Sequence, residues 1–240
     1  MPKVAKKTET PQQPKLTEPL TVSLVIPCYW VNRELIESTE RCLLSLADSG
    51  RQPDQLILVN DGSPKGMAPD NYFISRTKAQ TVEVEANRGY TIAVNRGLKA
   101  STGDVVIIGN NDLLFTKGWL DAILEPLKQG YDISSVATIE PKKSFVPSPG
   151  IVEGDKFGSL FAMTRRVLTK LGGLDEDLGR GYFTDLDLQK RAQDAGFKDG
   201  KSFKVAVQHL PKSTFRVVDP DDKMYLESKE AFIKKHGKVW

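Results

Sequence analysis

Two polar clusters and one histidine follow apolar runs in this 240-residue sequence, at positions where side chains reach a ligand without burying charge. Residues 60–63 (NDGS) follow LILV, residues 110–112 (NND) follow VVIIG, and His209 follows KVAVQ. The Asp61 carboxylate can accept hydrogen bonds from a nucleotide base or ribose. The Asp112 carboxylate can hold a hard divalent cation that neutralises a diphosphate, and a neutral His209 imidazole can complete that site.

The third cluster is FTDLDL at residues 183–188, after the glycine-rich segment GGLDEDLGRG. An aspartate at a helix start is stabilised by the helix dipole, which explains one of the two carboxylates but not both. If Asp185 faces the cleft, it can take the proton from an attacking hydroxyl. Asp187 can fix the loop or position the acceptor.

Each of these residues also has a plain structural explanation. Asp61 can belong to an Asp-Gly turn that caps the next helix. Asp112 can be one of the polar residues that commonly stand where a strand ends and a loop begins. A lone His209 is more often a hydrogen-bonded structural residue than a ligand, and we expect His236, in a charged terminal stretch, to lie on the surface.

The elements that must position these residues alternate between short apolar runs and helical patterns, which predicts an α/β fold with a mostly parallel sheet. The expected strands are VSLVIP, LILVN, TVEVEA, DVVIIGN, YDISSVAT, GSLFAMT and KVAVQH. The expected helices cover residues 33–47, a stretch around Asn71, and residues 90–100, 117–128, 183–195 and 222–235. Runs such as VVII are apolar at every position, as expected when helices cover both faces of the sheet. Ligands of such sheets bind beyond the carboxyl ends of the strands, where the clusters lie.

Composition limits the remaining choices. Residues 1–20 are rich in Pro, Gln, Lys and Thr and predict a disordered tail. Residues 21–220 are expected to form one domain, with a Rossmann-like nucleotide-binding half (21–115) and an acceptor-side half (116–220), followed by a terminal helix (221–240). The net charge of +3 gives no support for a nucleic-acid partner. The two cysteines lack metal spacing, and neither a membrane span nor a signal peptide is apparent, so we expect a cytoplasmic protein.

Taken in order, the motifs resemble the family 2 glycosyltransferases of the GT-A fold, particularly their rhamnosyltransferase-like branch. The resemblance covers about residues 21–212 and rests on SLVIPCYW, LILVNDGS, ANRGYTIAVNRGL, VVIIGNND, GSLFAMTRRVLTKLGGLDEDL and YFTDLDLQKRAQDAGF. It implies an inverting single displacement in which an acceptor hydroxyl attacks a sugar carried by UDP or TDP. The acceptor is expected to be a saccharide, a lipid-linked sugar or another hydroxyl compound.

The resemblance also assigns roles by position. Asp185 is the expected catalytic base, and Asp112 and His209 are the expected ligands of Mn²⁺ or Mg²⁺. Asp187 and Thr184 are expected on the acceptor side or in the adjoining loop. The expected donor-binding residues are Pro27, Tyr29, Asp61, Asn87, Gly89, Asn95, Asn110 and Asn111.

Two departures from the family pattern keep alternatives open. Asn60 and Thr184 each stand where the family usually has an acidic residue. Thr184 is therefore compatible with a module that binds nucleotide sugars but has lost turnover. A nucleotidyltransferase is a further alternative, although the sequence has neither a P-loop nor GxGxxG. A modified DNA base as the acceptor has only Lys142, Lys143 and the basic amino terminus in its favour.

Overall fold

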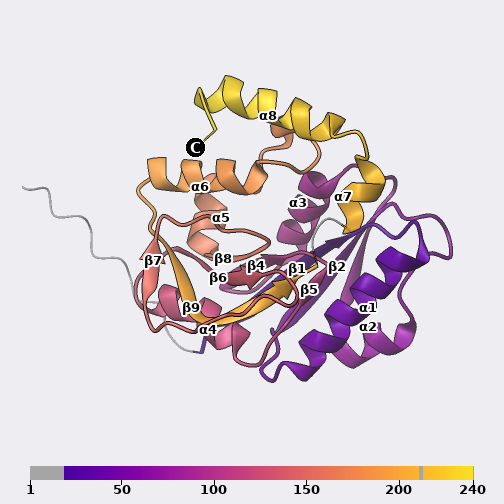
Figure 1. Ribbon diagram of the computed structural model, residues 1–240, viewed down its shortest axis with the longest axis horizontal. Helices are drawn as coiled ribbons and strands as arrows, with labels where there is room; N and C mark the ends of the chain where they lie inside the picture. Colours follow the sequence, from indigo (N-terminus) through magenta and orange to yellow (C-terminus); the bar gives the residue numbers. More distant parts are fainter. Residues whose placement is uncertain (1–18, 211–212, 240) are drawn as a thin grey trace, which may run out of the picture.

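The computed structural model describes residues 19–210 and 213–239, arranged as a central sheet with helices on both faces (Figure 1). The expected tail therefore lies outside the described residues except for its last two positions. The α/β class and the flanked, mostly parallel sheet predicted from the sequence are confirmed.

Nine strands form one sheet in the order β3-β2-β1-β4-β8-β6-β9-β5, with β7 paired to β9. Strands β3, β2, β1 and β4 are mutually parallel, β8 is antiparallel to β4 and β6, and β6 is parallel to β9. Strands β5 and β7 are antiparallel to β9. The strands are β1 (Val22–Cys28), β2 (Gln55–Asp61), β3 (Gln80–Val84), β4 (Val105–Gly109), β5 (Leu113–Leu114), β6 (Ile133–Ile139), β7 (Ile151–Glu153), β8 (Leu160–Thr164) and β9 (Asp199–His209).

The helices begin and end close to the expected positions, and local capping explains part of this. The side chain of Asn32 caps the first long helix by accepting a hydrogen bond from the amide of Leu35 at 2.9 Å. The helices are α1 (Arg33–Asp48), α2 (Asn71–Thr77), α3 (Tyr90–Ala100), α4 (Trp119–Lys128), α5 (Arg165–Leu171), α6 (Thr184–Asp194), α7 (Ser213–Val218) and α8 (Lys223–His236), with a 3-10 turn at Glu176–Leu178.

Alternate residues of the buried strands point into two separate hydrophobic cores, one on each face of the sheet. The strand sequences are therefore apolar at every position. Val25, Ile57 and Ile108 face the core that α3, α5 and α6 cover. Leu24 and Leu58 face the opposite core, which α1 and α4 cover. Burying each such side chain contributes about 1.5–3 kcal/mol, so the sheet that carries the polar clusters is strongly held.

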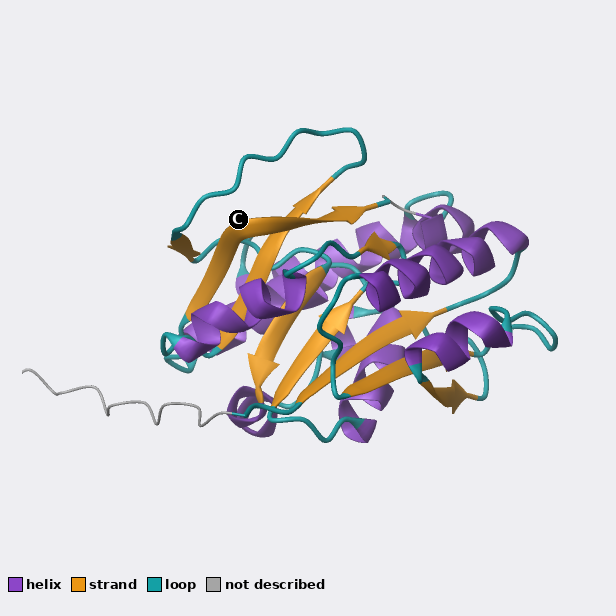
Figure 2. Cartoon of the chain, turned by 90° about the horizontal axis from the view of Figure 1, so that it is seen from below, coloured by secondary structure: helices purple, strands orange, loops and turns teal. Residues whose placement is uncertain are grey.

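Several elements were not expected from the sequence. Helices α5 and α7, the short strands β5 and β7, and the 3-10 turn are additional, and β9 begins at Asp199 rather than near Lys204. Residues 140–150 link β6 to β7 as a long exposed loop (Figure 2). Within residues 19–210 and 213–239, no helix is long and apolar enough to span a bilayer.

Candidate active site

The polar clusters converge at one edge of the sheet because the strands that precede them run in the same direction. Strands β1, β2 and β4 are parallel neighbours, and β9 runs the same way further along the sheet. A pocket lies at their carboxyl ends, as the rule for open α/β sheets predicts. Its described lining residues are Pro27, Cys28, Tyr29, Asp61, Asn87, Gly89, Tyr90, Ala93, Asn110, Asn111, Asp112, Arg180, His209, Thr214, Phe215, Val218 and Met224.

Asp112 and His209 meet in this pocket although they are 97 positions apart in the sequence. Strand β5 follows Asp112 directly and pairs antiparallel with the end of β9, so Leu113 lies opposite His209. The Nε2 atom of His209 lies 3.2 Å from Oδ1 of Asp112. The amide nitrogen of Leu210 also donates to the main-chain oxygen of Asp112 at 3.0 Å. The short strand thus places the two expected metal ligands side by side.

This pair suits a divalent cation that is shared with a ligand. Carboxylate oxygen and imidazole nitrogen are both ligands of Mn²⁺, and Asp112 is nearly buried at 5% exposure. Among the residues that the structure describes, no group of three His, Cys, Asp or Glu side chains can hold a metal. Two protein ligands fit an ion of the Mg²⁺ type, which completes its coordination with substrate phosphates and water. The residues therefore fit a metal that binds together with a diphosphate.

Asp61 is buried in the pocket floor and holds the turn that follows β3. Its carboxylate accepts hydrogen bonds from the amides of Arg88 at 2.9 Å and Gly89 at 2.8 Å, and from Nδ2 of Asn87 at 3.0 Å. Burial raises the pKa of Asp61, against the lowering effect of these bonds. Gly62 allows this approach, since its φ is +69° and an added Cβ would lie 2.3 Å from the backbone of Ala86. Asp61 thus lines the pocket and fixes the turn beside it.

Asp185 lies in the first turn of α6, outside the set of lining residues but close to Tyr90, which lines the pocket. Burial raises the pKa of Tyr90, and the charges of Asp185 and Asp112 raise it further, so its hydroxyl stays protonated. Burial also raises the pKa of Asp185, while backbone hydrogen bonds and Lys156 act in the opposite direction. A carboxylate with a raised pKa is a better proton acceptor.

Thr184 and Asp187 do not line the pocket. Thr184 is buried, and its hydroxyl donates to the oxygen of Gly181 at 3.3 Å, which supports the turn before α6. Asp187 is fully buried and faces α8. Its carboxylate accepts from Nε of Arg191 at 2.6 Å and Nζ of Lys235 at 2.6 Å, and Nε2 of His236 lies 2.8 Å away. Asp187 was expected either to fix the loop or to position the acceptor. Its contacts with α6 and α8 agree with the first role.

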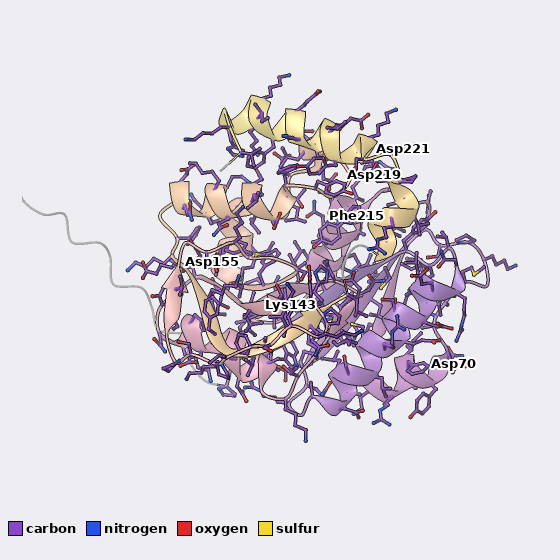
Figure 3. All side chains as sticks on the ribbon, viewed as in Figure 1. Asp70, Lys143, Asp155, Phe215, Asp219 and Asp221 are labelled. Atoms are coloured by element: carbon purple, nitrogen blue, oxygen red, sulfur yellow. The ribbon has the colours of Figure 1, made fainter. Side chains whose placement is uncertain are left out.

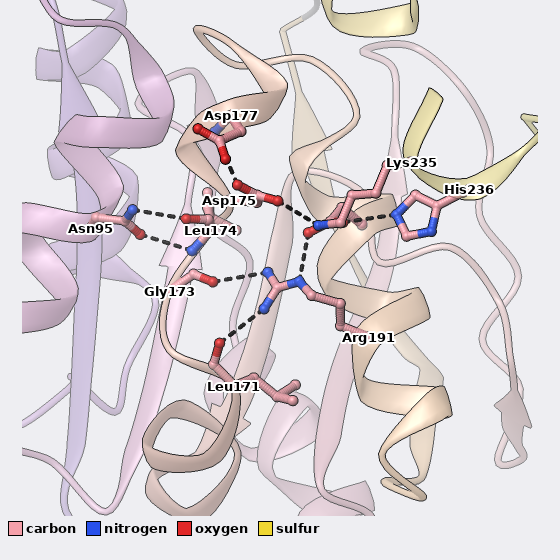
Figure 4. Close-up of polar contacts among 10 residues, drawn as sticks. Asn95, Leu171, Gly173, Leu174, Asp175, Asp177, Arg191, Lys235 and His236 are labelled. Atoms are coloured by element: carbon pink, nitrogen blue, oxygen red, sulfur yellow. Dashed lines mark hydrogen bonds and ion pairs between the residues drawn. The ribbon is translucent and has the colours of Figure 1, made fainter. Parts of the chain in front are cut away.

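The structure corrects the expectation for His236, which is not a surface residue. Only 9% of its side chain is exposed, and it packs on Phe232 with ring centroids 4.7 Å apart. Lys235 also pairs with Asp175, and Arg191 donates to the oxygens of Leu171 and Gly173 (Figure 4). Burial raises the pKa of Asp187, but the hydrogen bonds from Lys235, His236 and Arg191 outweigh it and hold the pKa below its ordinary value.

Replacing Asp187 with alanine is expected to lower the free energy of unfolding by about 3–5 kcal/mol, because it removes the fully buried carboxylate that the partly buried Arg191, Lys235 and His236 share. Urea denaturation of both proteins at pH 7 measures this difference. Asp194→Ala is the matched control on the same helix, since its pair with Lys190 is largely exposed and is expected to contribute less than about 1 kcal/mol. A loss at Asp187 no larger than that of the control would contradict the structural role.

Asn95 is also displaced from its expected role, because it binds the chain rather than facing the pocket. Its Oδ1 accepts from the amide of Leu174 at 2.8 Å, and its Nδ2 donates to the oxygen of Leu174 at 2.9 Å (Figure 4). The Nδ2 atom also donates to Glu176 at 2.9 Å. Asn111 does line the pocket, but its amide donates to Thr39 at 3.0 Å and so ties β4 to α1.

Sequence reasoning missed two parts of the pocket. Arg180, in the glycine-rich segment before α6, lines it beside Asn87. Helix α7 contributes Thr214, Phe215 and Val218, and Figure 3 shows Phe215 on this helix. The ring of Phe215 packs on Tyr182 with centroids 4.4 Å apart. The only sequence signals were an arginine among glycines and a short apolar stretch after the last strand.

Comparison with known proteins now identifies the family. The sequence model described as Glycosyl transferase family 2 matches residues 23–170, which is more than half of the chain. The chain belongs to glycosyl transferase family 2. The matched region includes Asp61 and Asp112 but ends before Asp185 and His209. The rhamnosyltransferase-like branch is not specifically supported by these comparisons.

Curated relatives of this family 2 chain are glycosyltransferases by name. The "Uncharacterized glycosyltransferase YwdF" of Bacillus subtilis (strain 168) is 27% identical over 125 residues, which cover 50% of this chain and 43% of the relative. An undecaprenyl-phosphate 4-deoxy-4-formamido-L-arabinose transferase of Pectobacterium carotovorum subsp. carotovorum (strain PC1) is 31% identical over 121 residues, covering 47% and 35%. The chain thus matches less than half the length of these relatives.

Solved structures confirm the expected GT-A fold. Glucosyl-3-phosphoglycerate synthase from Mycobacterium tuberculosis, in complex with Mn²⁺, UDP and glucosyl-3-phosphoglycerate, is similar with a TM-score of 0.64 and 17% identity, covering 92% of this chain and 82% of that one. GalNAc-T7 with UDP, GalNAc and Mn²⁺ gives a TM-score of 0.65 and 16% identity, covering 91% and 51%. At these identities the likeness concerns the fold alone.

Proposed function

We propose that this family 2 chain transfers a sugar from a nucleoside diphosphate to an acceptor hydroxyl, with inversion at the anomeric carbon. The observation that carries the proposal is the pocket at the carboxyl edge of the sheet, where Asp112 and His209 approach to 3.2 Å beside Asp61 and the Asn87 turn. A pair of metal ligands in a largely apolar pocket with a few converging polar side chains suits a diphosphate donor.

The donor's nucleoside is assigned to the side of the pocket formed by the ends of β1 and β2. Pro27, Tyr29 and Asp61 line it there, and Asp61 fixes Asn87 and Gly89 beside it. Asn110 and Asn111 also line the pocket and precede Asp112 in the sequence. We retain UDP or TDP as the carrier and Mn²⁺ or Mg²⁺ as the ion. Two relatives in fold are described as complexes with UDP and Mn²⁺, which supports the first of each pair.

The chemical step is a single displacement. The acceptor oxygen forms a bond to the anomeric carbon while the bond from that carbon to the diphosphate oxygen breaks, which inverts the configuration. Asp185 takes the proton of the attacking hydroxyl, and burial that raises its pKa favours this transfer. The divalent ion held by Asp112 and His209 would neutralise charge on the diphosphate. Tyr90 lines the cleft. The charges of Asp185 and Asp112 both raise the pKa of its hydroxyl, which therefore stays protonated.

The acceptor is assigned to the side of α6, where Asp185 begins the helix and the loop containing Lys156 lies near it. A relative in sequence is named for transfer to undecaprenyl phosphate, and a relative in fold is described with glucosyl-3-phosphoglycerate. We infer a saccharide, lipid-linked or other hydroxyl acceptor, and we retain the rhamnosyltransferase-like branch as a prediction.

The pH profile of kcat/KM is expected to fall on the acid side at a pH above the ordinary range of an aspartate. The base acts only when ionised, and burial raises the pKa of Asp185, so activity is lost as the pH falls through that raised value. The protein should remain folded when activity is lost. The pKa of Asp187 is lowered, so the stabilising effect of its carboxylate disappears only at a lower pH. Initial rates and circular dichroism across the same pH series test both points. Coincident loss of rate and of fold would contradict the assignment.

Proton NMR of the sugar product tests the proposed stereochemistry. UDP- and TDP-sugars are incubated with the protein, Mn²⁺ and a panel of saccharide acceptors, and the anomeric signals of donor and product are compared. Inversion supports the single displacement with one base. Retention of configuration would refute it, and tight donor binding with no product from any acceptor would favour a module that binds but does not turn over.

A further inference from the structure

Arg180 is the only lysine or arginine among the described residues that line the pocket. Two carboxylates, those of Asp61 and Asp112, line the same pocket. A diphosphate brings further negative charge, and the ion assigned to Asp112 and His209 lies at one end of it. A fixed cation elsewhere in the pocket would therefore favour binding of the diphosphate and its departure as the leaving group.

The guanidinium of Arg180 is already turned toward the donor side of the pocket. Its Nη2 atom donates to the main-chain oxygen of Asn87 at 3.1 Å and also to the side-chain oxygen of Asn87. Asn87 in turn donates to Asp61 at 3.0 Å. Both contacts of Arg180 use the same nitrogen, whereas a guanidinium carries five N–H donors in a planar fork that suits phosphate oxygens.

The segment that carries Arg180 is held on the side of α3. The hydroxyl of Thr91 donates to the oxygen of Gly179 at 2.7 Å. Asn95 makes two hydrogen bonds to Leu174 (Figure 4) and one to Glu176 within the same segment. Gly89 permits the closest contact, because a Cβ there would lie 2.7–3.0 Å from atoms of Arg180. These contacts fix the main chain of Arg180 against the turn that Asp61 holds.

Contacts to the carboxyl-terminal helix hold the segment from the other side. Lys235 of α8 pairs with Asp175 in this segment and with Asp187 of α6. Arg180 also precedes Asp185, the proposed base, by only five positions. Arg180 thus contacts the Asn87 turn at the pocket and precedes the helix that carries the proposed base.

We propose that Arg180 binds the terminal phosphate of the nucleoside diphosphate and neutralises it as the leaving group, in addition to the ion at Asp112 and His209. The proposal rests on the function proposed above. It predicts that Arg180 discriminates nucleoside diphosphates from monophosphates. The hydrogen bonds that fix the segment would then hold Arg180 in position for this contact.

Calorimetric titration of UDP and UMP, each with Mn²⁺, tests the assignment in the wild type, Arg180→Gln, Arg180→Lys and Arg51→Gln. Arg180→Gln is expected to weaken UDP by about 10- to 100-fold, as expected for loss of a charged hydrogen bond, and UMP by less than about threefold. Arg180→Lys keeps the charge but not the planar fork and is expected to weaken UDP by an intermediate factor. Arg51→Gln, at an exposed pair with Asp121, should change neither affinity.

Equal weakening of UDP and UMP, or no change in either, would overturn the role of Arg180 while leaving the proposed function intact. If Arg180→Gln does not fold, as judged by circular dichroism, the ratio of the two affinities in Arg180→Lys decides in the same way. If the wild type, titrated also with TDP and GDP, binds none of these nucleotides, the proposed function fails and this inference fails with it.

Discussion

Asp185→Asn is expected to lower the rate of sugar transfer by about 100- to 10,000-fold while leaving the donor's dissociation constant within about threefold of the wild type. Asparagine preserves the shape of the side chain and its place at the start of α6 but cannot accept the proton of the acceptor hydroxyl. Single-turnover rates and calorimetric titration of the donor separate the two effects.

Asp194→Asn is the matched control, because this aspartate lies on the same helix and pairs with Lys190 at the surface. The control should keep the wild-type rate and donor affinity. Near-full turnover in Asp185→Asn would refute the assignment of the base. A loss of donor affinity equal to the loss of rate would instead indicate that Asp185 binds the donor.

The second large effect is expected for Asp112→Asn, which should weaken Mn²⁺ in the presence of the nucleoside diphosphate by more than about 100-fold. Outer-shell changes at metal sites already cost about 10–100-fold in affinity, and loss of the carboxylate that lies 3.2 Å from His209 should cost more. Electron paramagnetic resonance of free Mn²⁺ measures the bound fraction without any need for turnover.

Asp121→Asn serves as the control for this variant, since Asp121 is largely exposed and pairs with Arg51 away from the pocket. The control should bind Mn²⁺ and nucleotide as the wild type does. Unchanged Mn²⁺ binding in Asp112→Asn would contradict the metal site. Weakened nucleotide binding in the absence of metal would indicate a direct contact between Asp112 and the donor.

The parallel half of the fold was predictable because its signals are local. Runs such as LILVN and VVIIG are apolar at every position, and the polar residues after them had to meet at one edge once the strands were parallel. The same reasoning brought Asp61, Asn87 and Asp112 to one pocket. The position of His209 after an apolar run and the family resemblance both indicated it as a metal ligand. Its approach to Asp112 depends on the two-residue strand β5, which the pattern did not reveal.

The parts that could not be predicted depend on contacts between distant residues. The sequence around His236 is charged and predicts a surface residue. Its imidazole is instead buried at its contact with the carboxylate of Asp187, 49 positions away. Asn95 matched a donor-binding motif, but its side chain forms hydrogen bonds with the main chain of Leu174, 79 positions away. Arg180 and Phe215 line the pocket because their segments fold back over the sheet edge, and no periodicity or spacing indicates this. Whether each remaining site residue contacts the donor stays a prediction.

Calorimetric titration of UDP, TDP and GDP into the purified protein, each with and without Mn²⁺, tests the central claim most directly. The account predicts that one carrier binds in the micromolar range or tighter and that this binding depends on Mn²⁺, because the diphosphate and the Asp112–His209 pair share the ion. Absence of binding by all three carriers, or binding that Mn²⁺ leaves unchanged, would contradict the account.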